Sequence, residues 1–81
     1  MEGVFTEQIA LPAGSPYAER RLGDTAARTR TRASIVAVIR GRSVLPSPGP
    51  EFLFAGGDVV VAVGTRTGLD RLAAILAGEE T

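Results

Sequence analysis

Five alternating residues, Arg28-Thr-Arg-Thr-Arg32, are the strongest candidate in the sequence for binding a charged ligand. A guanidinium group donates two parallel hydrogen bonds, a geometry that matches the oxygens of a phosphate. All nine basic residues are arginine, and positions 20–42 contain seven of them against one acid, Asp24, which gives this stretch a charge of +6. This concentration indicates an anionic partner, with a solvated basic surface as the alternative.

The composition helps to decide which anion this is. Proteins that bind nucleic acid through clustered arginines usually add aromatic stacking residues or a known motif, but this chain has four aromatic side chains and no such motif, so we do not expect nucleic acid. A small phosphorylated ligand fits better. The neighbouring Ile35 and Val36 and the proline-rich loop after them could hold an aromatic base.

The residues that most enzymes use for catalysis are missing. The chain has no Cys and no His, which excludes a thiol nucleophile, a Ser-His-Asp triad and the usual zinc ligands. The turn Gly64-Thr-Arg-Thr-Gly68 lacks the Lys and the spacing of a phosphate-binding loop, so it is interpreted as an ordinary strand-to-helix turn. We therefore expect a protein that is not an enzyme, with no metal and no cofactor.

The length and hydrophobic content predict one small folded domain. The chain has 81 residues, 44% of them hydrophobic, and no net charge. This is too apolar for intrinsic disorder and too short for a second domain. The longest apolar run is far shorter than a membrane-spanning helix, and the start Met1-Glu2-Gly3 lacks the basic region of a signal peptide, so we expect a soluble cytoplasmic protein.

The hydrophobic pattern predicts the elements that must position the arginine run. The expected order is strand, helix, strand, strand, strand, helix, an α/β (α+β) fold with a small, largely antiparallel four-stranded sheet. The strands are expected at 5–11, 34–40, 43–45 and 59–63, with a short helix at 22–30 and a last helix after Gly64.

Several details of these elements can also be predicted. Thr67 and Asp70 form a capping-box pattern for the last helix, and Gly78 ends that helix. Asp58 is interpreted as a turn residue that binds backbone. Neither central strand has a polar face, so both faces of the sheet need cover, and we expect a homodimer.

Four segments carry a resemblance to a known family: Arg28-Thr-Arg-Thr-Arg-Ala-Ser-Ile-Val-Ala-Val-Ile-Arg-Gly41, Pro48-Gly-Pro50, Gly57-Asp-Val-Val-Val61, and Gly64-Thr65. With them, the chain resembles the C-terminal domain of regulators of potassium conductance (RCK-C, or TrkA-C). In more detail it is similar to the regulatory subunits of bacterial potassium/proton antiporters. The resemblance implies a dimeric domain at 6–77, with 1–5 as a linker and 78–81 as a tail, within a longer protein whose N-terminal domain precedes it.

The family also implies a ligand and its contacts. Many members bind cyclic di-AMP at the dimer two-fold. By position, Arg28 matches the phosphate-binding arginine, Ser34 a polar residue at the strand start, and Ile35 and Val36 the apolar residues beside the adenine. Pro48 matches the loop that closes over the ligand. The expected ligand-binding residues are Arg28, Arg30, Arg32, Ser34, Ile35, Val36 and Pro48.

The sequence departs from the family at two positions. Arg32 stands where the family usually has Gly, and Ala26 where some cyclic di-AMP binders have Asp. The resemblance implies a regulatory domain that relays cyclic di-AMP occupancy to a membrane cation/proton antiporter at the inner face of the membrane. The alternative is a dimerisation or docking module of the same transport regulator that binds no ligand.

Overall fold

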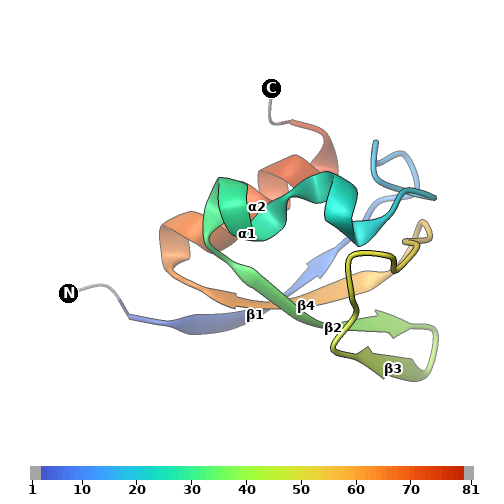
Figure 1. The fold of residues 1–81 in the computed structure, drawn as a ribbon, viewed down its shortest axis with the longest axis horizontal. Helices are drawn as coiled ribbons and strands as arrows, with labels where there is room; N and C mark the ends of the chain where they lie inside the picture. Colours follow the sequence, from blue (N-terminus) through green and yellow to red (C-terminus); the bar gives the residue numbers. More distant parts are fainter. Residues whose placement is uncertain (1–2, 80–81) are drawn as a thin grey trace.

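A computed structural model describes residues 3–79, so the expected linker (1–5) and tail (78–81) fall partly outside the described residues. Four strands and two α-helices follow one another along the chain, with a single 3₁₀ turn before the first helix (Figure 1). Their bounds are β1 Phe5–Ala10, the 3₁₀ turn Leu22–Thr25, α1 Ala27–Thr31, β2 Ser34–Arg40, β3 Ser43–Pro46, β4 Val59–Gly64 and α2 Arg66–Ala77. None of the helices in this part of the chain is long and apolar enough to cross a bilayer.

The four strands form one sheet in the order β1-β4-β2-β3, and every neighbouring pair is antiparallel. This confirms the predicted α+β fold. The register between β2 and β4 shifts between Ile35 and Ala37, which makes Val36 the extra residue of a β-bulge. Strand β3 pairs only with the second half of β2, from Ala37 to Arg40, so within residues 3–79 Ser34 and Ile35 have no strand partner on the side of β2 away from β4 and form an open edge.

Both α-helices lie on the same side of the sheet (Figure 1). Side chains alternate across a strand, and in β4 the alternation is clear: Val60 and Ala62 are fully buried under the helices, whereas Val59, Val61 and Val63 on the other face are only partly buried. The apolar side chains of the core are Ile9, Leu11, Ala27, Ala33, Val38, Phe54, Val60, Ala62, Leu69, Leu72 and Leu76. The sheet thus has one covered face and one uncovered, largely apolar face.

The prediction of a single helix at 22–30 is wrong, because the helical conformation is interrupted at Ala26. Ala26 has φ 47° and ψ 39°, which separates the 3₁₀ turn from α1. The buried Thr25 side chain fixes this break: its hydroxyl donates to the Leu22 carbonyl (2.8 Å) and accepts from the Ala27 amide (3.1 Å). The side chain of a single threonine therefore replaces the backbone hydrogen bonds of a continuous helix.

The start of α2 also differs from the prediction. The N-cap is Thr65, whose hydroxyl accepts a hydrogen bond from the Gly68 amide (3.0 Å), and Thr67 lies inside the helix. Asp70 pairs instead with Arg66 one turn away. The predicted end is confirmed, since Gly78 adopts φ 82°, the left-handed conformation that glycine tolerates best.

The prediction that Asp58 binds backbone is confirmed, and the structure adds an ion pair. The carboxylate accepts from the Ala55 amide (2.9 Å) and from Arg40 through Nε and Nη2 (2.8 Å each). Its side chain is 1% exposed. The Arg40 hydrogen bonds lower the pKa of Asp58 from its usual value, against the opposing effect of burial.

Arg32 ends α1 in the left-handed conformation, with φ 65° and ψ 10°. This conformation disfavours residues with a Cβ, which explains why a family member would have Gly here. We expect Arg32→Gly to raise the free energy of unfolding by about 0.5–1 kcal/mol in urea denaturation. Thr29→Gly is the control: glycine at a helical position of α1 should lower the free energy of unfolding, by about 0.3 kcal/mol, because glycine has a lower helix propensity than threonine. A loss of stability in Arg32→Gly would contradict the prediction.

Candidate functional site

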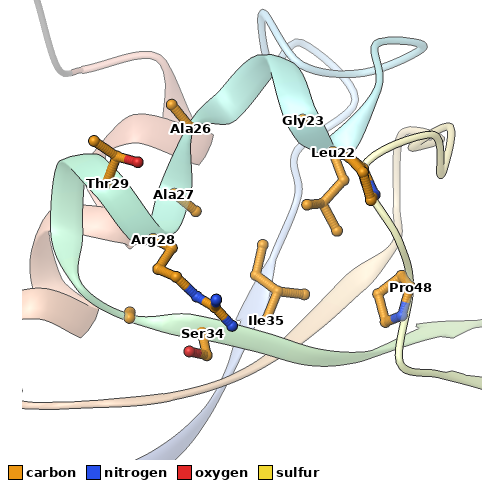
Figure 2. A pocket seen from close by; sticks show the side chains of 11 residues that line it. Leu22, Gly23, Ala26, Ala27, Arg28, Thr29, Ser34, Ile35 and Pro48 are labelled. Atoms are coloured by element: carbon orange, nitrogen blue, oxygen red, sulfur yellow. The ribbon is translucent and has the colours of Figure 1, made fainter.

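A pocket of about 340 Å³ opens between α1, the start of β2 and the proline-rich loop after β3 (Figure 2). Arg28 is the only charged residue in its lining. The other lining residues are small or apolar, apart from two hydroxyl residues: Leu22, Gly23, Ala26, Ala27, Thr29, Ala33, Ser34, Ile35, Pro48 and Pro50. A single cation above an apolar floor suits a ligand with one phosphate and one aromatic base on this side of the domain.

The Arg28 side chain extends from α1 toward Ser34 and Ile35, while Leu22 and Pro48 lie on the far side of Ile35 (Figure 2). Arg28 is exposed, and it forms no side-chain hydrogen bond or ion pair with any residue of the described chain. Its donors are therefore available to a ligand. No acid lines the pocket to compete with an anion.

Backbone hydrogen bonds fix the proline-rich loop at the mouth of the pocket. The Gly23 amide donates to the Pro50 carbonyl (2.9 Å), and the Ser47 amide donates to the Val36 carbonyl (2.9 Å). The approach at Gly23 is close: a Cβ there would lie 3.1 Å from the Pro50 carbonyl oxygen. The loop is thus attached both to the 3₁₀ turn and to β2, which sets the position of Pro48.

The structure brings together four of the seven predicted site residues: Arg28, Ser34, Ile35 and Pro48 all line the pocket. Val36 does not line it; this residue lies on the bulge and is 41% exposed. Arg30 donates to the Tyr17 hydroxyl (3.0 Å) and the Thr25 carbonyl (3.2 Å), which packs it against the N-terminal part of the chain. Arg30 and Arg32 line a different hollow on α1.

Seven lining residues were not among the predicted ones: Gly23, Ala26, Ala27 and Ala33, and three larger residues that extend the pocket. Leu22 comes from the 3₁₀ turn, Thr29 follows Arg28, and Pro50 closes the loop. Two signals could have found them: Leu22 is an isolated apolar residue among charged ones, and Pro50 shares the loop with Pro48. The break at Ala26, which separates the 3₁₀ turn containing Leu22 from α1, had no sequence signal.

Comparison with known proteins gives matches over most of the chain. Potassium channel protein 1 of Methanocaldococcus jannaschii is 36% identical over 59 residues, which are 73% of this chain but 18% of the channel. The chain therefore spans less than a fifth of that relative.

Three solved structures share the fold. The RCK_C domain dimer of S. agalactiae BusR in complex with c-di-AMP has a TM-score of 0.80 at 24% identity, covering 88% of this chain and 93% of that one. BusR bound to its promoter DNA matches over 35% of its chain. The RCK C domain of the potassium transport protein KtrA, also in complex with c-di-AMP, has a TM-score of 0.72 at 24% identity. The match covers 89% of this chain and 80% of the KtrA chain.

The family assignment follows from a match over most of the residues that build the sheet, the helices and the pocket. The TrkA-C domain model matches residues 6–77, from the first strand to the end of the last helix. The chain belongs to the TrkA-C (RCK_C) domain family.

Proposed function

We propose that this domain binds cyclic di-AMP at the two-fold axis of a homodimer and relays its occupancy to a membrane cation/proton antiporter that transports potassium. The observation that carries the proposal is the pocket with the unpaired Arg28 over Ile35. Cyclic di-AMP has two phosphates and two adenines related by a two-fold axis. Two copies of this pocket would give each half one guanidinium and one apolar floor.

The open edge of β2 supports a dimer at this place. Ser34 and Ile35 line the pocket, and on the side of β2 away from β4 they lie beyond the end of β3. An open strand edge can pair with the same edge of a second copy, and antiparallel pairing of one segment with itself obeys two-fold symmetry. Such a dimer would place two pockets beside one axis.

Structural neighbours support the same ligand. BusR and KtrA domains of this fold have been solved with c-di-AMP, and their matches cover most of this chain. The relation to potassium transport rests on the KtrA domain and on the potassium channel relative. The match to the channel covers 18% of the channel's length. The transporter partner is therefore a proposal for the full-length protein.

Calorimetric titration of the 81-residue chain with cyclic di-AMP tests the ligand, with light scattering to measure the mass. We expect saturable heat with one ligand per two chains and a higher melting temperature with ligand, because the ligand stabilises the state that binds it. ATP and NAD serve as comparison ligands. If the chain dimerises but gives no heat and no thermal shift, the proposal that it binds cyclic di-AMP is wrong. The alternative is then a dimerisation module without a ligand, which is the function favoured by Ala26 at the position where some cyclic di-AMP binders have Asp.

A further inference from the structure

A second hollow, of about 330 Å³, lies on α1 next to the first turn of α2. It joins two segments that are distant in sequence: the end of the arginine-threonine run and the Gly64–Gly68 turn. Its lining contains three arginines, four threonines and one glycine, with no acid: Thr29, Arg30, Thr31, Arg32, Thr65, Thr67, Gly68 and Arg71. The hollow is thus lined by three arginines, against one in the Arg28 pocket.

Close packing holds the two segments together. A Cβ on Gly68 would lie 2.7 Å from the Thr31 carbonyl oxygen, so only glycine lets α2 approach the end of α1 this closely. The buried Thr31 hydroxyl donates to the Ala27 carbonyl (2.6 Å) and accepts from the Ala33 amide (2.9 Å). The walls of the hollow are therefore fixed before any ligand arrives.

The hollow offers hydrogen-bond donors that the fold leaves unused. Arg32 is exposed and forms no side-chain hydrogen bond or ion pair within residues 3–79. The hydroxyls of Thr29 and Thr67 are on exposed residues beside it. By contrast, Arg66 in the same turn pairs with Glu7 and Asp70 and does not line the hollow. The available groups all donate, and none carries a negative charge.

We propose that this hollow binds a phosphate group of a small phosphorylated molecule, with Arg32 as its principal contact. Guanidinium and hydroxyl donors without a competing acid suit the several acceptor oxygens of a phosphate or pyrophosphate. The site is separate from the Arg28 pocket, since only Thr29 lines both. It would add a second anion to the domain and does not depend on the cyclic di-AMP proposal.

Titration with inorganic pyrophosphate, followed by amide NMR shifts of the ¹⁵N-labelled chain at constant ionic strength, tests the proposal. We expect saturable shifts at Arg32, Thr67 and Gly68. Arg32→Gly should weaken binding about tenfold, the effect of one charge-assisted hydrogen bond. This variant is expected to be more stable than the parent, so unfolding would not explain the loss. Arg42→Gln, which removes the same charge from the exposed β2–β3 turn, should bind as the parent does.

Each of four outcomes would overturn the proposal. Shifts that rise linearly without saturation, or equally with sodium chloride, would show only screening. Shifts confined to Arg28, Ser34 and Ile35 would place the anion in the other pocket. Equal weakening of pyrophosphate binding by Arg42→Gln and Arg32→Gly would show that the anion responds to the overall positive charge of the domain and not to a site at Arg32. Tighter binding of a polyglutamate peptide than of pyrophosphate would replace the phosphate with an acidic protein segment.

Discussion

Arg40→Met is expected to lower the free energy of unfolding by about 3 kcal/mol at neutral pH, because it leaves the buried Asp58 carboxylate without its cation. Arg40 binds both carboxylate oxygens, donates to the Leu53 carbonyl (3.0 Å) and lies 5.2 Å from the centre of the Phe52 ring. Methionine keeps an unbranched apolar side chain but removes the guanidinium that lies over Phe52 and its charge. Among the described residues, the Ala55 amide alone would remain as a donor to the carboxylate.

The reciprocal substitution, Asp58→Asn, should lower the free energy of unfolding by less than Arg40→Met does. The Arg40 side chain is 43% exposed, whereas that of Asp58 is 1% exposed. In Asp58→Asn, the remaining guanidinium can therefore be hydrated, while in Arg40→Met the remaining carboxylate cannot. Urea denaturation at one fixed protein concentration measures both, with Arg42→Met in the exposed turn as the control. A cost for Asp58→Asn equal to or larger than that for Arg40→Met would contradict this asymmetry.

The pH dependence gives a further test of the same pair. Arg40 lowers the pKa of Asp58 in the folded state. In the parent chain, the pair therefore contributes stability that is fully present above the unfolded carboxyl pKa of about 3.9 and is lost as pH falls through the lower, folded value. In Arg40→Met, burial without a cation raises the Asp58 pKa. Protonation of Asp58 at low pH then removes the unpaired buried charge and the loss of stability that it causes. The stability difference should shrink between pH 7 and pH 3, and a constant difference would contradict the assignment.

The sheet could be predicted from sequence because its signals are local. The β-branched runs at Ser34–Arg40 and Val59–Gly64 define strands without reference to the rest of the chain. The split of the first helix could not be predicted. It depends on the buried Thr25 hydroxyl, which binds backbone on both sides of Ala26 only once the core has formed. The N-cap of α2 could not be predicted for a similar reason. Thr65 and Thr67 both have a hydroxyl that can cap a helix, and the sequence does not show which of them does so.

The arginine run shows a second limit of sequence analysis. Composition identifies Arg28, Arg30 and Arg32 as one basic cluster, but successive positions on a helix point in different directions. In the structure, Arg28 lines one pocket, whereas Arg30 and Arg32 both line the second hollow and Arg30 also donates to the Tyr17 hydroxyl. The sequence shows the concentration of charge, but its division between two hollows depends on the bend at Ala26 and the packing of α2.

Arg28→Ala is expected to weaken cyclic di-AMP binding by at least a hundredfold, provided that the proposed two-fold site is correct. One substitution in a homodimer removes two guanidiniums, one from each phosphate. A hydrogen bond to a charged group contributes about 1.5–3 kcal/mol, so two lost contacts correspond to a hundredfold or more in affinity. Stability should change little, because Arg28 is exposed and makes no contact that the fold needs.

Mixed dimers make the symmetry itself measurable. A dimer with one parent chain and one Arg28→Ala chain keeps a single guanidinium, so its loss in binding free energy should be half that of the double variant. Arg42→Gln, which removes the same charge from the exposed β2–β3 turn outside the pocket, is the control and should bind cyclic di-AMP as the parent does. If the mixed dimer binds as tightly as the parent, one protomer holds the ligand alone. The site would then be a single pocket, and the ligand could not link the two chains through its own symmetry.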